Sequence, residues 1–341
     1  TNNYDVMGVV GNGASHLVQK EAGIEEADLL IAVTESDELN LLCCLIAKKA
    51  GNCSTIARVR NPMYSNEVNF IKEELGLSMT INPECAAATE IARILRFPSA
   101  IKIDTFAKGR VELLKFKIEE GSMLHGCSLI EVSKTLKTDV LVCAVEREDD
   151  VMIPNGSFVL QANDVISIVA SPRNARDFFK KIGVETHQVK NVMIVGGGTM
   201  AYYLSKQLLS MGIDVKIVEK DKERCEVLSE LLPKAVIING DATNQDVLLE
   251  EGIRHCESFV SLTGIDEGNI FLSLFAKNCS KAKVVTKINR ISFDDIINKF
   301  NLGSLIYPKN ITAEYIVRYV RALKNSIGSN VETLYRIIEN K

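Results

Sequence analysis

Several features are scarce or missing in this 341-residue sequence, and each absence excludes a class of protein. The longest uninterrupted apolar run, Leu41 to Ala47, has seven residues, whereas roughly 20 are needed to cross a bilayer. No charged segment followed by an apolar one opens the chain, so we expect no secretory signal. There is no basic block, and 40 Lys and Arg against 44 Asp and Glu give a net charge of −4, which argues against nucleic-acid binding.

Cysteine and histidine are placed poorly for cross-linking, metal binding or catalysis. The nine cysteines form no C-x-x-C pair, and Cys43 and Cys44 are adjacent, so we expect a reducing cytoplasm and no disulfide framework. Metal-ligand spacing is absent. We expect core packing for Cys43, Cys44, Cys53 and Cys279, and surface positions for His16, His125, His187 and His255.

The chain contains an internal repeat. Shifted by 229 residues, residues 11–61 align with residues 240–290 without a gap and with twelve identities. A second stretch, shifted by 225, matches Pro83, Ile91, Arg93 and Arg96 with Pro308, Ile316, Arg318 and Arg321. Two ungapped stretches indicate two copies of one domain. The identical positions in the first copy are Gly11, Val18, Glu21, Gly23, Ile24, Thr34, Asp37, Glu38, Asn40, Leu45, Ala47 and Lys48.

The fuller second copy predicts an α/β fold. Apolar runs predict strands at 191–195, 215–219, 235–238, 258–263 and 283–288, with helices between them. This alternation is typical of a parallel sheet covered by helices on both faces. In the first copy, the apolar run from Tyr4 to Val10 predicts a strand.

Different sequence lies between the copies. Residues 104–170 predict short strands at 111–118, 140–145 and 165–170 around a helix at 128–136, which indicates a small α+β module. The predicted domains are a Rossmann-like domain at 1–103, the module at 104–185, a second Rossmann-like domain at 186–325, and the start of a second module at 326–341. The last prediction depends on residues 331–338, which resemble residues 111–118.

A glycine motif marks a candidate nucleotide site in the second copy. Gly196-x-Gly198-x-x-Ala201 follows a predicted strand and opens a predicted helix, and Glu219 ends the next strand. Gly196 allows a tight turn, Gly198 lets the backbone approach a pyrophosphate, and Glu219 can accept hydrogen bonds from an adenosine ribose. The predicted binding residues are Gly196, Gly198, Thr199, Met200, Glu219, Lys220, Arg224, Asp241, Ala242, Thr263 and Glu267.

Structural roles compete with binding at three of these places. Asp241 lies where the chain would pass an adenine, but it or Thr243 can equally cap a helix. Thr263 lies at the carboxyl end of the predicted fourth strand, on the ligand side of the sheet, and both roles stay open for it. The segment from Asp266 to Asn269, which recurs in the first copy, more simply caps and charges a helix start.

The motifs together resemble a known family. The segments 194–198, 217–221, 240–243 and 250–252, with 22–28 and 34–40 in the first copy, resemble the regulator-of-potassium-conductance (KTN/RCK) domain. The resemblance implies tandem RCK-N domains with an RCK-C module between them. It also implies a cytoplasmic regulatory subunit, peripheral to the inner face of the membrane, that forms a ring or dimer on a membrane-embedded potassium-translocating Trk subunit. NAD(H), or alternatively ATP/ADP, would bias the gate, without catalysis.

The first copy departs from the family pattern. At the 229-residue offset, the positions equivalent to the glycine turn and to Glu219, the acidic residue that would contact the ribose, fall before Thr1. We therefore expect a chain trimmed at both ends. We also expect it to bind one nucleotide, in the second copy. We also expect NAD(H) to be preferred over NADP(H), although Lys220 and Arg224 soften the discrimination, and an oligomer rather than a monomer. Two alternatives stay open: an NAD-dependent oxidoreductase using the same glycine motif, and a scaffold with vestigial sites.

Overall fold

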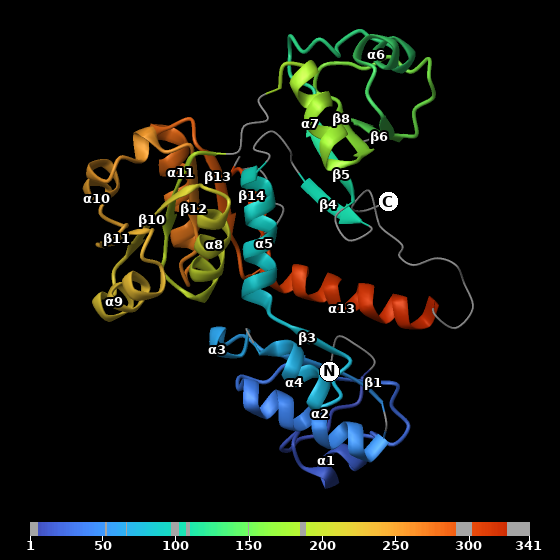
Figure 1. Cartoon of the computed structure of the whole chain (residues 1–341), viewed down its shortest axis with the longest axis vertical. Coiled ribbons are helices and arrows are strands. Elements are labelled where there is room, and N and C mark those ends of the chain that lie inside the picture. The colour runs from blue at the N-terminus through green and yellow to red at the C-terminus, as the bar shows by residue number, and fades with distance from the viewer. Residues whose placement is uncertain are drawn as a thin grey trace. The chain divides into compact units, whose positions relative to one another are not determined.

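The computed structural model contains two compact units (Figure 1). It describes residues 6–51, 53–65, 67–96, 102–106, 110–148, 150–184, 189–290 and 302–325. The first unit consists of two segments, the residues up to Ala87 and Pro308–Ile316. The second unit consists of Ala88–Tyr307 and the residues from Val317 onward. Helices α5 (Pro83–Arg96) and α13 (Pro308–Asn325) belong to both.

The first unit holds a three-stranded parallel sheet in the order β1-β2-β3. Helix α2 packs on β1 and β2 and buries Cys43, Cys44 and Ala47. The expected core positions of Cys43, Cys44 and Cys53 are confirmed, since each is at most 4% exposed. The elements are α1 (His16–Glu21), β1 (Leu29–Ala32), α2 (Asp37–Gly51), β2 (Ser54–Arg58), α3 (Pro62–Ser65), α4 (Val68–Glu74) and β3 (Met79–Ile81).

The predicted strand from Tyr4 to Val10 is wrong where the structure describes it. Residues 6–10 form no strand, and the side chains of Val6, Met7 and Val10 are 60%, 83% and 101% exposed. An apolar run becomes a strand only when a neighbouring strand takes up its backbone hydrogen bonds. The three strands of this sheet pair only with one another in the described residues, so residues 6–10 have no such neighbour there.

The described residues between 102 and 184 include a five-stranded antiparallel sheet in the order β4-β5-β8-β6-β7, and we call this part of the chain the antiparallel module. Its core includes the rings of Phe116, Phe178 and Phe179, which meet edge to face. A capping box formed by Ser128 and Glu131 begins α6. The elements are β4 (Lys102–Phe106), β5 (Val111–Lys117), α6 (Leu129–Leu136), β6 (Val140–Arg147), β7 (Asp150–Met152), β8 (Val165–Ala170) and α7 (Pro172–Lys181).

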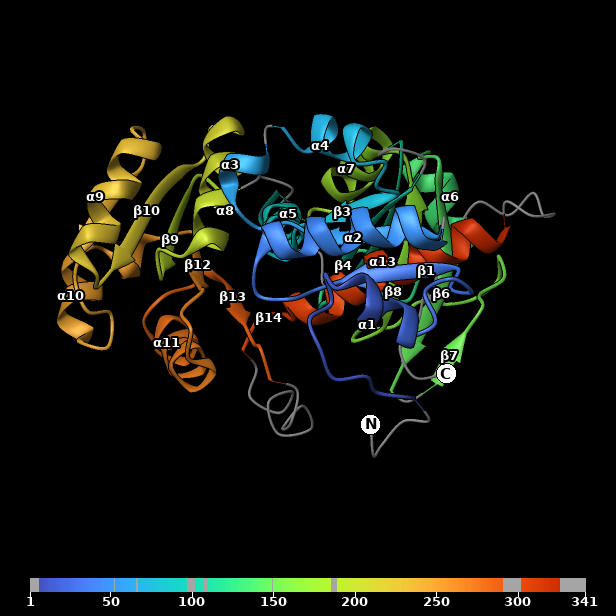
Figure 2. The same ribbon diagram turned by 90° about the horizontal axis from the view of Figure 1, so that it is seen from below.

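The second copy is a six-stranded parallel sheet in the order β11-β10-β9-β12-β13-β14. Helices α8 and α9 lie on one face and α10 and α11 on the other (Figure 2). The elements are β9 (Asn191–Val195), α8 (Thr199–Ser210), β10 (Asp214–Glu219), α9 (Lys222–Leu231), β11 (Val236–Asn239), α10 (Gln245–Glu250), a 3-10 turn (Ile253–His255), β12 (Ser258–Ser261), α11 (Asp266–Cys279), β13 (Lys283–Lys287) and β14 (Ser304–Ile306).

The sheet order places the candidate site. The chain passes from β9 to β10 and β11 on one side, and then returns to β12 on the other side of β9. Ligands of such sheets bind outside the carboxyl ends of the strands at this reversal. The α/β fold class, with two parallel sheets and a small antiparallel one, is confirmed. The predicted strand at 331–338 lies outside the described residues.

Candidate functional site

The glycine turn joins β9 to α8. Gly196 has φ +97°, and a Cβ there would lie 3.0 Å from the backbone C of Leu262 and the backbone N of Thr263, so only glycine fits. Gly198 precedes α8 directly, and a Cβ there would meet no atom within 4 Å. The space next to Gly198, at the N-terminus of α8, is therefore open, so a phosphate could approach the N–H groups of the first helical turn.

Glu219 and Arg224 hold the middle residue of the turn. The N–H of Gly197 donates to Glu219 Oε2 at 2.5 Å, and Arg224 Nε donates to the Gly197 carbonyl at 2.6 Å. Glu219 Oε1 accepts from the backbone N–H of Asp221 at 2.9 Å. Glu219, the residue predicted to contact a ribose, thus lies beside the glycine turn that is predicted to contact a pyrophosphate.

The end of β11 lies next to Glu219. Asn239 pairs with Glu219 in the sheet register, and the N–H of Gly240 donates to the Glu219 carbonyl at 2.9 Å. Asp241 Oδ1 accepts from the backbone N–H and the hydroxyl of Thr243, at 2.9 and 2.8 Å. These hydrogen bonds lower the pKa of Asp241, and the charge of Lys220 adds to the effect. Asp241 therefore shapes a turn, and its carboxylate is exposed. The expected helix cap at Asp241 or Thr243 is wrong, because Asn244 caps α10.

Buried Asn269 and partly buried Thr263 form a polar scaffold at the end of β12. Asn269, which is 0% exposed, accepts from the N–H and hydroxyl of Thr263 at 2.9 and 2.7 Å and donates to the carbonyls of Thr263 and Lys287. Asp266 accepts from the backbone N–H groups of Asn289 and Arg290. Asp266 and Asn269 therefore make structural contacts, but the expected helix cap is wrong, because the N-cap of α11 is Ile265 and no side chain caps it. Asp266 and Glu267 do place negative charge in the first turn of α11.

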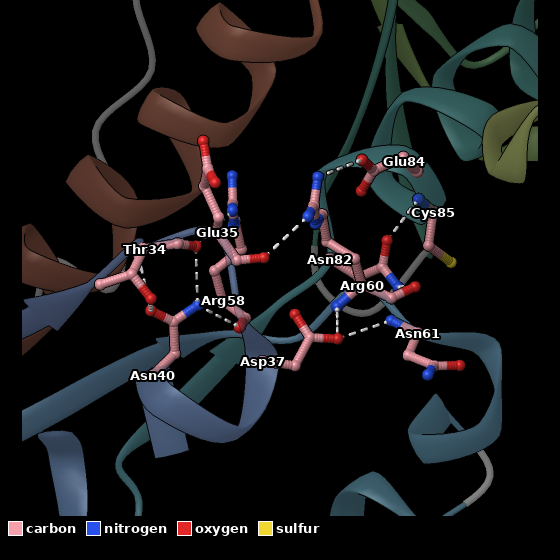
Figure 3. A network of polar contacts seen from close by, with 10 residues as sticks. All are labelled: Thr34, Glu35, Asp37, Asn40, Arg58, Arg60, Asn61, Asn82, Glu84 and Cys85. Atoms are coloured by element: carbon pink, nitrogen blue, oxygen red, sulfur yellow. Dashed lines mark hydrogen bonds and ion pairs between the residues drawn. The ribbon is translucent and has the colours of Figure 1, made fainter. Parts of the chain in front are cut away.

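The first copy repeats this scaffold at the equivalent residues (Figure 3). Asn40 accepts from the N–H and hydroxyl of Thr34 and donates to the carbonyls of Thr34 and Arg58. Asp37 accepts from the backbone N–H groups of Arg60 and Asn61, both at 2.8 Å. The same contacts in both copies show that the scaffold belongs to the domain fold rather than to one ligand site.

The remaining predicted residues divide into core and surface. Met200 and Ala242 are 7% and 8% exposed, so their side chains pack in the core. Thr199 is half-buried at the first turn of α8, whereas Lys220 and Glu267 are exposed. The structure joins the turn to Glu219, Arg224 and the end of β11 through hydrogen bonds, but no described contact joins Glu267 to them.

Two residues at the site were missed in the sequence. Gly197 is buried, and a Cβ there would lie 2.7 Å from Leu228 Cδ1 and 3.1 Å from Glu219 Oε2. Asn239 Nδ2 donates to the carbonyls of Glu219 and Lys220, at 3.2 and 3.0 Å. The run of three glycines was the available signal for Gly197, whereas nothing in the sequence pattern singles out Asn239.

Other chemistry is not apparent in the described part of the chain. No group of three or more His, Cys, Asp or Glu could hold a metal ion there. His16, His125 and His255 are exposed as expected, while His187 lies outside the described residues. Burial raises the pKa of the Cys44 thiol to about 12, which leaves it unreactive. Within the same residues no helix combines the length and the apolar character that a membrane span requires.

The glycine turn after the first strand of a doubly wound parallel sheet places the second copy in the class of Rossmann-like nucleotide-binding domains. The TrkA-N domain family matches residues 2–83 and 192–308, and the TrkA-C domain family matches residues 113–183. A Trk system potassium uptake protein trkA homologue of Methanosarcina mazei is 33% identical over 98% of this chain and 82% of its own length. The Trk system potassium uptake protein TrkA of Haemophilus influenzae is 32% identical over 97% of this chain and 72% of its own.

These matches show that the chain belongs to the TrkA family of potassium uptake proteins. Among solved structures, the GsuK channel is similar in fold, with a TM-score of 0.72 at 16% identity over 96% of this chain and 57% of that one. The GsuK channel bound to NAD has a TM-score of 0.68 at 16% identity, covering 93% of this chain and 56% of that one. From here on the parallel domains are called the TrkA-N copies, and the antiparallel module is called the TrkA-C module.

Proposed function

We propose that this chain is a nucleotide-sensing regulatory subunit of a Trk-type potassium uptake system. In this proposal it gates a membrane-embedded potassium-translocating subunit in response to NAD(H) or ATP/ADP. One observation carries the proposal: an open glycine turn at the start of α8 is hydrogen-bonded to the acid that would hold a ribose. Membership of the TrkA family and the folds of GsuK bound to NAD and to ADP support it.

The residues present fit an adenine nucleotide. The space over Gly198 leaves room for a pyrophosphate beside the N–H groups of Thr199 and Met200, which begin α8. Glu219 would accept hydrogen bonds from the ribose hydroxyls. Lys220 and Asp241, which are exposed, lie just beyond the carboxyl ends of β10 and β11, next to Glu219. The bound nucleotide would supply differential binding energy between gating states, since a ligand shifts an equilibrium only through its unequal affinity for the two states.

Calorimetry with NADH, NAD, NADPH, ATP and ADP tests the proposal. We expect at least one of them to bind at a stoichiometry of one per chain. If none binds at millimolar concentration, the nucleotide-sensing role is contradicted and a vestigial site is favoured instead.

The proposal also states that the chain catalyses no turnover of the nucleotide. The oxidoreductase alternative shares the glycine motif, so the motif alone does not separate the two. Overnight incubation with NADH and a panel of carbonyl compounds does separate them, because a regulatory subunit leaves NADH unconsumed. Steady NADH oxidation above a protein-free control would contradict the regulatory interpretation.

We further propose that the chain assembles with copies of itself, as a ring or dimer, at the cytoplasmic face of the membrane. Equivalent helices of the two TrkA-N copies support this, because each exposes a large apolar side chain at the same repeat position: Leu42 is 46% exposed and Phe271 is 71% exposed. Light scattering at micromolar concentration should give a multiple of 37.6 kDa. A mass equal to that value would contradict self-assembly of this chain.

A further inference from the structure

We propose that Arg224 is a positioning residue that sets the glycine turn for a pyrophosphate through its Nε–H bond to Gly197, rather than through its charge. The inference rests on the proposed function and adds to it the residue that prepares the site. Arg224 lies 27 residues beyond Gly197 in the chain, on the first turn of α9.

The Gly197 residue is held on both sides. Its N–H donates to Glu219 Oε2 at 2.5 Å, and its carbonyl accepts from Arg224 Nε at 2.6 Å. The turn has no spare room at this point, because a Cβ on Gly197 would lie 2.7 Å from Leu228 Cδ1. Two hydrogen bonds and a close packing contact therefore fix the orientation of the turn.

The fixed carbonyl determines where the next N–H points. In a trans peptide unit the C=O of one residue and the N–H of the following residue point in opposite directions. Because Arg224 binds the Gly197 carbonyl, the Gly198 N–H is turned away from Arg224. Gly198 is exposed and faces open space, so this N–H and those of the first turn of α8 are prepared for a phosphate.

Arg224 is itself placed by the same group of residues. Asp221 caps α9 by accepting from the Arg224 backbone N–H at 2.8 Å, and the Asp221 N–H donates to Glu219 Oε1 at 2.9 Å. Glu219, Asp221, Arg224 and Gly197 therefore form a closed ring of hydrogen bonds. Glu219 and the glycine turn therefore belong to one hydrogen-bonded group, although its members Gly197 and Arg224 are 27 positions apart in the sequence.

Side-chain chemistry allows donor and charge to be tested separately. Glutamine carries an amide nitrogen at the position of arginine Nε, so Arg224→Gln keeps a donor there and removes the charge. Lysine carries a methylene at that position, so Arg224→Lys keeps the charge and moves the donor. Arg224→Met removes both. Lys222→Gln is the matched control, because it removes a positive charge from the same exposed turn of α9.

The experiment measures NADH and ADP affinity by calorimetry, together with hydrogen exchange of residues 196–200 in the ligand-free chain. We expect Arg224→Gln and Lys222→Gln to bind within about threefold of the unmodified chain. Arg224→Lys and Arg224→Met should raise Kd about tenfold, the effect of losing one hydrogen bond. Exchange in the turn should be faster in those last two variants only.

The opposite order, with Lys retaining affinity and Gln losing it, would show that the charge acts directly and would overturn the inference. Equal affinity and equal exchange in all variants would also overturn it. If the unmodified chain binds none of NADH, NAD, NADPH, ATP and ADP, the proposed function fails. Hydrogen exchange of residues 196–200 in the ligand-free variants then decides by itself whether Arg224 fixes the conformation of the glycine turn.

Discussion

The two TrkA-N copies share a polar scaffold and differ in the elements that would hold a nucleotide. Both copies use an Asn on the first helical turn after a strand to bind a Thr and the next strand, through matching hydrogen bonds of Asn40 and Asn269. The glycine turn after β9 and the acid at the end of β10 occur in the second copy alone among the described residues. The scaffold therefore belongs to the fold, and the site depends on β9 and β10.

Another detail supports this division. Asn12 and Asp241 lie at equivalent positions, and each side-chain oxygen accepts from the backbone N–H two residues later, at 3.0 and 2.9 Å. The preceding glycines, Gly11 and Gly240, are both crowded by an equivalent valine, since a Cβ would come within 2.8 and 2.9 Å of it. Residues that are identical in the two copies thus help to form the same turn in both. Sequence alone does not tell such a structural role from a contact with a ligand.

The largest expected effect comes from the element that only the second copy has. Gly198→Asp places a carboxylate in the space that a pyrophosphate would occupy, so we expect NADH binding to fall by more than about 100-fold through charge repulsion and steric exclusion. Calorimetry measures it. Asn278→Asp, which adds the same charge on the last turn of α11, is the control and should bind normally. Retained binding in Gly198→Asp would place the nucleotide elsewhere.

The next prediction concerns the element that both copies share. Asn40→Ala and Asn269→Ala should each lower local stability by about 3 kcal/mol, because several backbone and hydroxyl groups lose their buried partner. Hydrogen exchange of α2 and of α11 measures the two losses separately. A large loss in one copy and none in the other would break the equivalence of the scaffolds.

A smaller effect is expected at the ribose acid. Glu219→Ala should weaken NADH binding by about 1–3 kcal/mol, because charge-assisted hydrogen bonds to the ribose and to the turn are lost. The same carboxylate should repel a 2′-phosphate, so the unmodified chain should prefer NADH to NADPH. Parallel titrations of both nucleotides check this prediction, and equal affinities in the unmodified chain would contradict it.

The smallest effect belongs to the TrkA-C module, which serves as a reference outside both copies. Burial alone would raise the pKa of Asp164, but hydrogen bonds from Arg147 and from the Gln161 backbone, with the charge of Arg147, outweigh it and lower that pKa. Because the folded state holds the depressed pKa, the stabilisation is present above the ordinary Asp pKa near 4 and is lost as pH falls through the folded value.

Asp164→Asn should therefore cost the module about 1–2 kcal/mol at pH 7 and flatten its acid-side loss of stability. Hydrogen exchange of β8 at several pH values measures both effects, and NADH affinity should not change. An altered NADH affinity in this variant would show that the module and the nucleotide site are coupled.

The sequence predicted the parallel strands β9 to β13 of the second copy to within about two residues, because each is a short apolar run bounded by turn residues. It also predicted the glycine turn and its acid as neighbours. It did not predict β3, β4, β7 or β14, which are three to five residues long and depend on their sheet neighbours rather than on a local pattern. The run from Tyr4 to Val10 failed for the converse reason, since its local pattern had no neighbouring strand.

Within the candidate site, the roles of individual side chains were less predictable than their positions. Met200 and Ala242 follow glycines at ligand-side turns, yet their side chains are buried in the core. The contact between Arg224 and Gly197 joins residues far apart in sequence and follows no periodic pattern. The binding roles of the predicted residues stay predictions.

The stoichiometry of nucleotide binding tests the comparison most directly. An equilibrium titration of the unmodified chain with NADH should saturate at one nucleotide per chain, because among the described residues only the second copy joins a glycine turn to a ribose acid. Saturation at two per chain would contradict the account, since the polar scaffold common to both copies would then be sufficient to hold a nucleotide.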